Sequence, residues 1–412
     1  MSTPATTART GRIHLDLVTL GIVSAIVLLG LVMVTSASMA IASRDGGEPF
    51  AFLERQLVLV AGGCFAAAIA FSVRTELLER WATPLLGVAL LMLVLVAIPG
   101  VGHMVNGSRR WLRILGISIQ VSEVTRVIAL VWVASYAVRR EAELRSSFKG
   151  LLIPLGVIGL CMALLLLEPD FGASAVLLSV AFALLFIAGA RWRDVIGLAV
   201  VCGAGMAALA YFEPYRLKRL TSFLDPWSDP FASGFQLTQS LMAIGRGGWT
   251  GVGLGESVQK LFYLPEAHTD FLFAVLAEEL GLVGVLLTLG LFVGLAWRVL
   301  WVARQAQEAG LKFQAYLAAG FGIWVGLQSM INIGVNMGAL PTKGLTLPFM
   351  SYGRSSMIAA LVWLGIVMRV YHETAVAARG ATATSLRGGS AARATDEPRL
   401  DRKSTRLNSS HA

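Results

Sequence analysis

The stretch LDLVTLGIVSAIVLLGLVMVTSASMAIA, residues 15–42, decides the fold, because almost every position in it is apolar. A helix needs about 20 such residues to cross a lipid bilayer. The run is too long for the apolar part of a cleavable signal peptide, and no mature soluble domain follows it. We therefore interpret it as the first membrane-spanning helix of an integral membrane protein.

Nine further apolar runs repeat this pattern along the chain. They cover residues 52–73, 82–99, 121–138, 150–168, 171–190, 193–212, 271–300, 313–338 and 356–371. The chain is 56% hydrophobic and 14% charged, whereas about a quarter of the residues in a soluble domain are charged. The sequence predicts an all-α integral membrane protein with about ten transmembrane helices.

These spans form one membrane domain, residues 15–371, between a short tail, 1–14, and a longer tail, 372–412. The longer tail is rich in Ala, Arg, Ser, Thr and Gly, a composition typical of disorder. Its last stretch, DRKSTRLNSSHA, is unlike the rest of the chain, and we interpret it as foreign sequence. A large loop, 213–270, separates spans seven and eight and is far longer than an ordinary connection.

Basic residues predict the orientation. An even number of spans places both termini on one side, and the short loops of that side carry eleven Lys and Arg residues against six on the other. Because such residues accumulate in cytoplasmic loops, we expect both termini in the cytoplasm and the 213–270 loop outside. The net charge of +9 follows from this bias and from the basic tail, so we exclude nucleic acid as a partner.

The first candidate site is LPEAHTDF, residues 264–271, directly before the eighth span. Asp270 is its last polar residue, and a helix that starts there continues the same face through small residues, Ala274, Ala277, Gly281 and Gly284. Small residues permit either close helix packing or room for a bulky ligand. An aspartate beside an apolar wall can act as a general base. The alternative is that Asp270 only caps the helix.

The second candidate is the glycine-rich stretch 245–255, which carries Arg246 and is followed by Lys260. Exposed backbone N–H groups beside two cations suit a phosphate. The stretch lacks the P-loop pattern of nucleotide-binding proteins. The alternative interpretation is a flexible outer loop.

The third candidate is NMGALPTKGLTLPFMSYGRSS, residues 336–356. Its prolines and glycines break the helix, and irregular backbone at membrane depth is tolerated where it lines a wet cavity. The side chains that favour an anionic or sugar head group are Lys343, Ser351, Ser355 and Ser356, with Arg354 among them. The alternative is a simple interfacial loop.

Two further elements complete the outward-facing polar sequence. Arg109 and Arg110 precede a tryptophan, and Glu123 lies three residues before Arg126, so the latter two can pair on one helical face. Interfacial anchoring and a structural ion pair are the alternatives to substrate contact. The sequence EPDFG, 168–172, is typical of a tight turn between two spans.

Five of these motifs, taken in order, resemble the SEDS family, which groups the RodA-, FtsW- and SpoVE-type proteins of bacterial cell-wall synthesis. The motifs are RRW followed by QVSE, EPDFGAS, DPWSDPFASGFQLTQSLMAIGRGGWTGVGLG, LPEAHTDF and PTKGLTLPFMSYGRSS. The resemblance covers residues 15–371 and is closer to the FtsW-type division proteins than to the RodA type. It implies a peptidoglycan glycosyltransferase that polymerises lipid II, with the family's essential aspartate at Asp270.

The resemblance also implies a setting. It places the chain in the bacterial inner membrane at the division septum, with its active site facing the periplasm. The partners it implies are a class B penicillin-binding protein, which is a transpeptidase, and other divisome proteins. The substrate-binding candidates are Arg246, Lys260, Glu266, His268, Thr269, Lys343, Ser351, Ser355, Ser356, Arg109, Arg110 and Glu123. The requirement for a divalent cation, Mg²⁺ or Mn²⁺, is left open, and no metal ligands are assigned.

Three departures and two alternatives accompany this interpretation. Arg354 replaces the second glycine of the family's SYGGSS, Val121 replaces the proline of QPSE, and Arg126 replaces a lysine. The first change puts the local backbone conformation in doubt. The alternative functions are a lipid II flippase, which needs charged residues deep in the spans such as Glu278 and Glu279, and a non-catalytic divisome scaffold.

Overall fold

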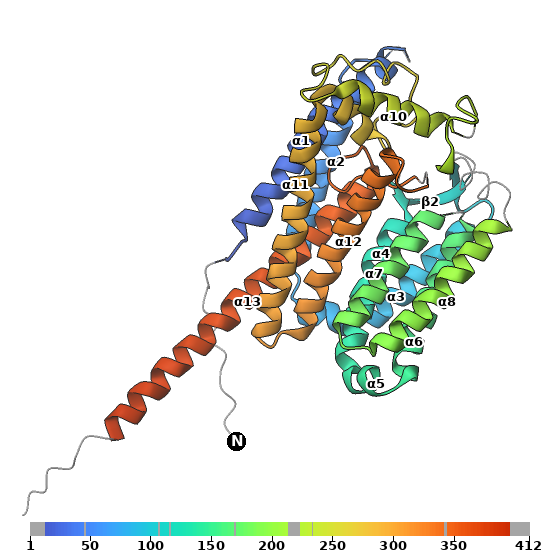
Figure 1. Ribbon diagram of the computed structural model, residues 1–412. Helices are drawn as coiled ribbons and strands as arrows, with labels where there is room; N and C mark the ends of the chain where they lie inside the picture. The colour runs from blue at the N-terminus through green and yellow to red at the C-terminus, as the bar shows by residue number, and fades with distance from the viewer. Residues whose placement is uncertain are drawn as a thin grey trace, which may run out of the picture.

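A computed structural model of the chain describes residues 13–44, 47–105, 108–114, 117–168, 170–212, 223–232, 234–341 and 344–395. Ten long helices occupy the predicted spans within this part (Figure 1). They are α1 (Leu17–Arg44), α2 (Ala51–Ser72), α3 (Thr75–Ala97), α4 (Val121–Arg139), α6 (Phe148–Leu167), α7 (Phe171–Ile187), α8 (Trp192–Tyr211), α11 (Leu272–Glu308), α12 (Lys312–Asn336) and α13 (Arg354–Thr395). Eight of the described helices are long and apolar enough to span a membrane, and α7 is a shorter apolar helix.

Several helix boundaries differ from the predicted runs, and α11, for example, ends at Glu308, eight residues after the predicted end at 300. Helix α3 begins at Thr75, seven residues before the apolar run, because the charged turn that precedes the run is also helical. Helix α13 does not end at residue 371 but continues to Thr395. The predicted disordered tail is therefore helical over its first part, which its alanines and arginines favour. Residues 396–412 lie outside the described part of the chain.

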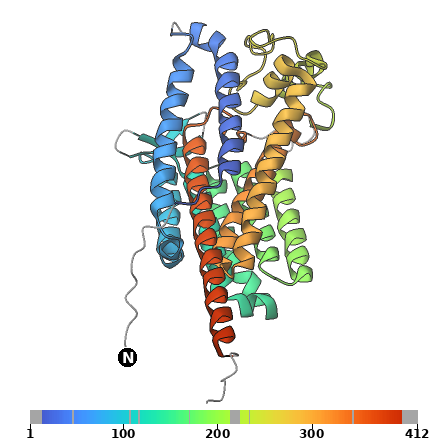
Figure 2. The same ribbon diagram turned by 90° about the vertical axis from the view of Figure 1, so that its left-hand side faces the viewer.

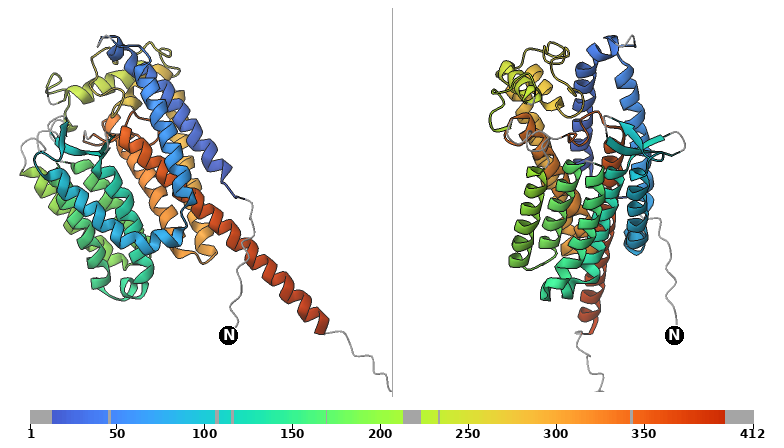
Figure 3. Two further views of the ribbon diagram at one scale, coloured as in Figure 1. Left: turned by 180° about the vertical axis from the view of Figure 1, so that it is seen from behind. Right: turned by 90° about the vertical axis from the view of Figure 1, so that its right-hand side faces the viewer.

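The helices run up and down, so that the first helix begins and the last helix finishes at the same end of the bundle (Figures 1 and 2). The short helix α5 (Glu141–Ser146) marks this end, which we call the α5 end. The opposite end carries α10 (Phe235–Gly247) and is called the α10 end. Helix α13 packs along α2, and α11 packs along α12 (Figure 3). A Cβ on Gly365 of α13 would lie 2.2 Å from the backbone oxygen of Ala67 on α2, so glycine permits this close approach.

A small antiparallel sheet at the α10 end was not predicted. Its strands are β1 (His103–Val105), β2 (Ser108–Ile114) and β3 (Ile117–Gln120), in that order. Trp111 pairs with Gln120, and Leu112 with Ile119. The all-α prediction is confirmed for the membrane-spanning helices, and the sheet is a local feature of the connection between α3 and α4.

The interior and the exterior of the bundle are both apolar, as expected where lipid replaces water. Phe321 and Trp324 of α12 pack against Trp363 of α13, and the two tryptophan rings are stacked 5.7 Å apart. Large apolar side chains such as Val58, Phe65 and Val200 remain exposed on the outer helix faces. These faces suit contact with lipid chains.

The loop between α8 and α11 folds back over the bundle at the α10 end (Figure 1). Its helix α10 packs on α11. Helix α11 itself is interrupted at Gly281, whose φ of 62° and ψ of −159° are not helical. The face predicted to run from Asp270 through Gly284 is therefore broken after Ala277, because the chain turns at Gly281.

Candidate active site

Asp270 lies in the turn directly before α11, and α12 holds its backbone. Its carbonyl oxygen accepts hydrogen bonds from the side-chain amides of Asn332, at 2.9 Å, and Asn336, at 3.1 Å. The helix begins with Phe271 as its N-cap and no side chain caps it. Asn336 Oδ1 instead accepts from the N–H of Ala274 in the first turn. The alternative that Asp270 serves as a helix cap is therefore not supported.

The Asp270 carboxylate lies against the loop between α12 and α13. A Cβ on Gly344 would be 2.9 Å from Asp270 Oδ2, so the carboxylate rests on the backbone of that glycine. The next residue, Leu345, packs against Gly172 at the start of α7, and its carbonyl oxygen accepts from Asn332. Asp270 thus lies where the turn before α11 meets α12 and the loop that follows α12. Lys343, which precedes Gly344, lies outside the described residues.

The neighbours of Asp270 in LPEAHTDF serve mainly to shape the turn. Thr269 donates its hydroxyl to Glu266 Oε2 at 2.8 Å. The His268 ring packs against Phe52 and Tyr352, whose rings also contact each other, and the His268 carbonyl oxygen accepts from the N–H of Tyr352. Burial lowers the pKa of His268, although the charge of Glu266 opposes this effect. His268 is therefore expected to be neutral at pH 7.

The serines of the third candidate are partly used within the loop itself. Ser351 is buried, and its Oγ accepts from the N–H of Leu347. Ser355 Oγ accepts from the N–H of Gln120 at the end of β3. Ser356 is half-buried, and Arg354 is exposed as the first residue of α13. Because Arg354 points to the surface, its bulk does not distort the interior.

The sheet and the EPDFG turn are joined by Arg110. Its Nε donates to the carbonyl oxygen of Glu168 at 2.9 Å, and Arg109 precedes it on β2, half-buried. The predicted turn is confirmed, because Asp170 caps α7 by accepting from the N–H of Ala173. Burial raises the pKa of Glu168 to about 8, the nearby Asp170 adds to the rise, and Arg110 opposes it.

Glu123 is buried and forms an ion pair with Arg126 at 3.1 Å. Arg126 also donates to Gln328 Oε1, and Gln328 Nε2 donates to the carbonyl oxygen of Thr346. A polar chain therefore runs from α4 across α12 to the loop that carries Gly344. This geometry favours the structural alternative for Glu123 over direct substrate contact.

The glycine-rich stretch fills the break in α11. The N–H groups of Val252 and Gly253 donate to the carbonyl oxygens of Glu278 and Glu279. A Cβ on Gly251 would lie 2.0 Å from the Glu279 oxygen, so only glycine fits at this position. The stretch is thus neither a flexible loop nor a free phosphate cradle over these residues, because its amides are already paired.

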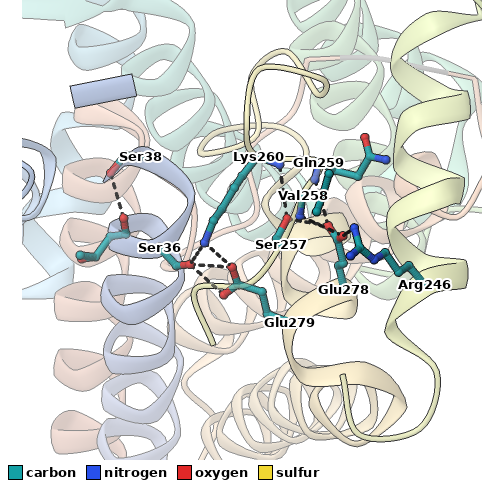
Figure 4. Close-up of polar contacts among 10 residues, drawn as sticks. Ser36, Ser38, Arg246, Ser257, Val258, Gln259, Lys260, Glu278 and Glu279 are labelled. Carbon is teal, nitrogen blue, oxygen red and sulfur yellow. Dashed lines mark hydrogen bonds and ion pairs between the residues drawn. The ribbon is translucent and has the colours of Figure 1, made fainter. Parts of the chain in front are cut away.

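The two cations next to this stretch have different surroundings (Figure 4). Lys260 is only 6% exposed and pairs with Glu279 at 2.7 Å. Its burial argues against contact with a substrate phosphate. The Arg246 side chain is 48% exposed and lies 3.5 Å from Glu278, so it remains accessible to a ligand.

The sequence singled out Asp270 as a candidate but did not indicate the groups that hold its backbone. Asn332 and Asn336 lie four residues apart in an otherwise apolar span, which is a detectable signal for a buried polar role. Within the described residues, no three His, Cys, Asp or Glu side chains come together in a way that could hold a metal ion.

An apolar cavity of about 330 Å³ lies beside α11, bounded by α10 and the end of α12. Ala277 and Gly281 line it, together with Phe273, Trp249 and Met337. The small residues of α11 thus leave room on one side of the helix. This agrees with the second of the two predictions made for them, which were close helix packing and room for a bulky ligand.

Comparison with known proteins places the chain among bacterial cell-wall proteins. Residues 16–376 match the FtsW/RodA/SpoVE family model, described as cell cycle protein. A probable peptidoglycan glycosyltransferase FtsW from Thioalkalivibrio sulfidiphilus is 53% identical over 85% of this chain and 88% of the relative. The protein of the same description from Nitrosococcus halophilus is 52% identical over 87% of this chain and 92% of the relative.

Solved structures show the same fold. A chain of a peptidoglycan synthase complex, studied for the coordination of polymerization and crosslinking, matches with a TM-score of 0.73 and 33% identity over 88% of this chain and 99% of that chain. The rod shape determining protein RodA of Thermus thermophilus matches with a TM-score of 0.65 and 30% identity over 88% of this chain and 98% of that chain.

Proposed function

The chain belongs to the FtsW/RodA/SpoVE family, also called SEDS, and from this premise we infer that it is a multi-pass membrane peptidoglycan glycosyltransferase of the FtsW type. Its proposed substrate is lipid II, and its proposed product is the glycan strand of the septal cell wall. The observation that carries the assignment of the site is the placement of Asp270, where α11, α12 and the loop before α13 meet.

We propose that Asp270 is the general base. The 4-hydroxyl of the acceptor sugar attacks the anomeric carbon of the donor, and a new C–O bond forms. The hydroxyl proton passes to the Asp270 carboxylate. The bond between the anomeric carbon and the lipid diphosphate breaks, and its electron pair leaves with the diphosphate. A positioned base of this kind contributes about 10²–10⁴-fold to a rate.

Cations are proposed to stabilise the negative charge that develops on the leaving diphosphate. The accessible candidates are Arg246 and Arg109, and Lys343 follows from its place in sequence next to Gly344. Lys260 is omitted, because it is buried and already paired. The half-buried Ser356 and Thr269 remain proposed contacts for sugar hydroxyls.

The setting of the reaction is also a proposal. The similarity to a chain of a peptidoglycan synthase complex supports a class B penicillin-binding protein as partner, and other divisome proteins are proposed with it. The excess of basic residues at the α5 end supports an orientation with that end in the cytoplasm. Asp270 would then face the periplasm, where lipid II is consumed at the septum.

The direct test uses the chain purified with its transpeptidase partner and supplied with lipid II. We expect Asp270→Ala and Asp270→Asn to reduce polymerisation by at least about 100-fold. Asp225→Asn removes an exposed carboxylate from the same loop and should leave the rate unchanged. Normal polymerisation by Asp270→Ala would show that the base assignment is wrong.

The same preparations separate the alternative functions. A flippase moves lipid II across liposomes without forming a glycosidic bond, so translocation without polymerisation would favour transport. The charged side chains described within the spans do not favour it, because Glu279 and Glu123 are paired with cations. A wild-type phenotype of cells carrying Asp270→Ala would favour a scaffold.

A further inference from the structure

The break in α11 is sealed by the glycine-rich stretch. Beyond the bonds to Glu278 and Glu279, the N–H groups of Leu282 and Val283 donate to the carbonyl oxygens of Gly248 and Trp249, at 3.0 and 3.2 Å. The helix groups left unpaired on both sides of Gly281 thus find partners in one neighbouring segment. The first part of α11 and the stretch that begins at Gly248 therefore form one rigid unit.

Two buried carboxylates extend from this unit to the segment that leads to Asp270 (Figure 4). Glu278 accepts from the Ser257 hydroxyl at 2.5 Å and from the N–H of Val258 at 3.1 Å. Glu279 accepts from Lys260 Nζ at 2.7 Å and from the Ser36 hydroxyl at 2.7 and 2.8 Å. Both carboxylates are 1% exposed or less. The turn at 257–260 is thus fixed to α11.

The Ser36–Lys260–Glu279 triad joins three segments that are distant in sequence. Lys260 Nζ also donates to Ser36 Oγ at 2.8 Å, so the hydroxyl, the ammonium group and the carboxylate contact one another. Ser36 belongs to α1, Lys260 to the large loop and Glu279 to α11. A buried ion pair with this geometry is fixed, because loss of one partner leaves an uncompensated charge.

Asp270 is at the far end of the segment that the triad holds. Between Lys260 and Asp270, Phe262 and Glu266 adopt positive φ angles of 69° and 56°. Such conformations are costly for residues other than glycine and persist only where the surroundings impose them. The triad fixes one end of this segment, and Asn332 and Asn336 of α12 fix the other.

We propose that Lys260 and Glu279, together with Ser36, are positioning residues for Asp270. The proposal rests on the function inferred above, in which Asp270 is the base. The triad does not touch the reacting atoms but holds the strained segment 261–269, so that the carboxylate keeps its place against Gly344. A shift of a catalytic group by about 1 Å can reduce a rate about 100-fold.

The test compares variants of the triad with variants of a matched ion pair on the same two helices. Asp16, directly before α1, and Arg298, in the last third of α11, pair at 2.8 Å, whereas Asp270 precedes the first residue of α11. The arms are Lys260→Met, Glu279→Gln, the Lys260→Met/Glu279→Gln double variant, Lys260→Arg, Asp16→Asn and Asp270→Asn. Each is purified with the transpeptidase partner. The measurements are kcat and KM for lipid II, the pH dependence of kcat, and the thermal midpoint.

We expect Lys260→Met and Glu279→Gln to lower kcat by about 10–100-fold with little change in KM, and to shift the acidic limb of the pH profile, which reports the base. Lys260→Arg should retain most of the activity. The double variant contains no unpaired buried charge, so its thermal midpoint should recover while kcat stays low. Asp16→Asn should lower the thermal midpoint and leave the pH profile unchanged.

Two results would overturn the proposal. In the first, the double variant recovers kcat together with its thermal midpoint, and the triad then only stabilises the fold. In the second, the ratio between the fall in kcat and the fall in thermal midpoint is the same for the triad variants as for Asp16→Asn. An Asp270→Asn variant with normal activity would instead overturn the base assignment, which distinguishes a failure of the proposed function from a failure of the positioning role.

Discussion

Helices α1 and α11 are joined near each end through an ion pair, but the two ion pairs differ in the segments that they connect. At the α5 end, Arg298 of α11 donates to both carboxylate oxygens of Asp16, directly before α1, at 2.9 and 2.8 Å. At the α10 end, Glu279 of α11 reaches α1 through Ser36, and its cation, Lys260, comes from a loop. The Asp16–Arg298 pair thus joins two segments, and the Ser36–Lys260–Glu279 triad joins three.

This difference separates stability from function. A direct pair between two helices has one task, which is to hold the helices together. A pair whose cation comes from a third segment also sets the position of that segment, and here the segment ends at Asp270. Changes at the α5 end should therefore alter the free energy of unfolding, and changes at the α10 end should alter turnover.

The largest expected effect comes from adding one methyl group at each end. Gly344→Ala places a Cβ 2.9 Å from Asp270 Oδ2, and Gly150→Ala places one 2.3 Å from the carbonyl oxygen of Glu143 at the α5 end. We expect Gly344→Ala to reduce polymerisation about 100-fold by displacing the carboxylate. Gly150→Ala should cost roughly 1–3 kcal/mol of stability through overpacking and leave kcat near the wild-type value.

Kinetics and thermal denaturation of both variants, measured in the same detergent, check this contrast. Gly290→Ala provides a further control on α11, because a Cβ there meets no atom within 4 Å. If Gly150→Ala lowers kcat as strongly as Gly344→Ala, the two ends are not functionally distinct.

These contrasts show how far sequence could lead. Apolar runs located all ten spans, because lipid imposes length and composition on each helix locally. The polar residue before the eighth span marked Asp270 as a candidate, and its proposed role came from the family resemblance. The burial of Lys260 could not be predicted, because it depends on Ser36, which lies 224 positions away along the chain. The same holds for Gly344, whose need for a hydrogen side chain arises from contact with Asp270.

The second-largest expected effect is the stability that the ionised Asp16 contributes and that is lost at acidic pH. Burial raises the pKa of Asp16, but hydrogen bonds from Arg298 and Thr19 and the charge of Arg298 outweigh burial and lower it below 3.8. A carboxylate with a lowered pKa stabilises the fold above its unfolded value and loses this contribution as the pH falls through the folded value. Asp16→Asn should therefore cost roughly 1–3 kcal/mol at neutral pH.

The measurement is the thermal midpoint of wild type and Asp16→Asn between pH 3 and pH 7. The difference between them should begin to shrink below about pH 4, where the carboxylate of the unfolded chain becomes protonated, and it should be lost as the pH falls through the lower pKa of the folded carboxylate. A constant difference over this range would contradict the role of the ionised pair.

The smallest expected effect is the pH dependence of stability that Glu168 produces at the α10 end. Its sign is opposite to that of Asp16, because stability falls as the pH rises. Both of its carboxylate oxygens are buried and accept no hydrogen bond within the described residues. Its pKa is raised to about 8 from 4.5. Because the folded chain holds this proton more tightly than the unfolded chain, stability is highest below pH 4.5 and declines as the pH rises through about 8.

The wild-type thermal midpoint should fall by at least about 2–4 °C over this pH window, the shift that accompanies 1 kcal/mol. Glu168→Gln, which cannot ionise, should lack this decline, whereas Glu256→Gln on the exposed loop should retain it. An identical decline in Glu168→Gln and wild type would show that Glu168 is ionised in the folded chain. The buried carboxylates of the two ends, Asp16 and Glu168, would then both be ionised.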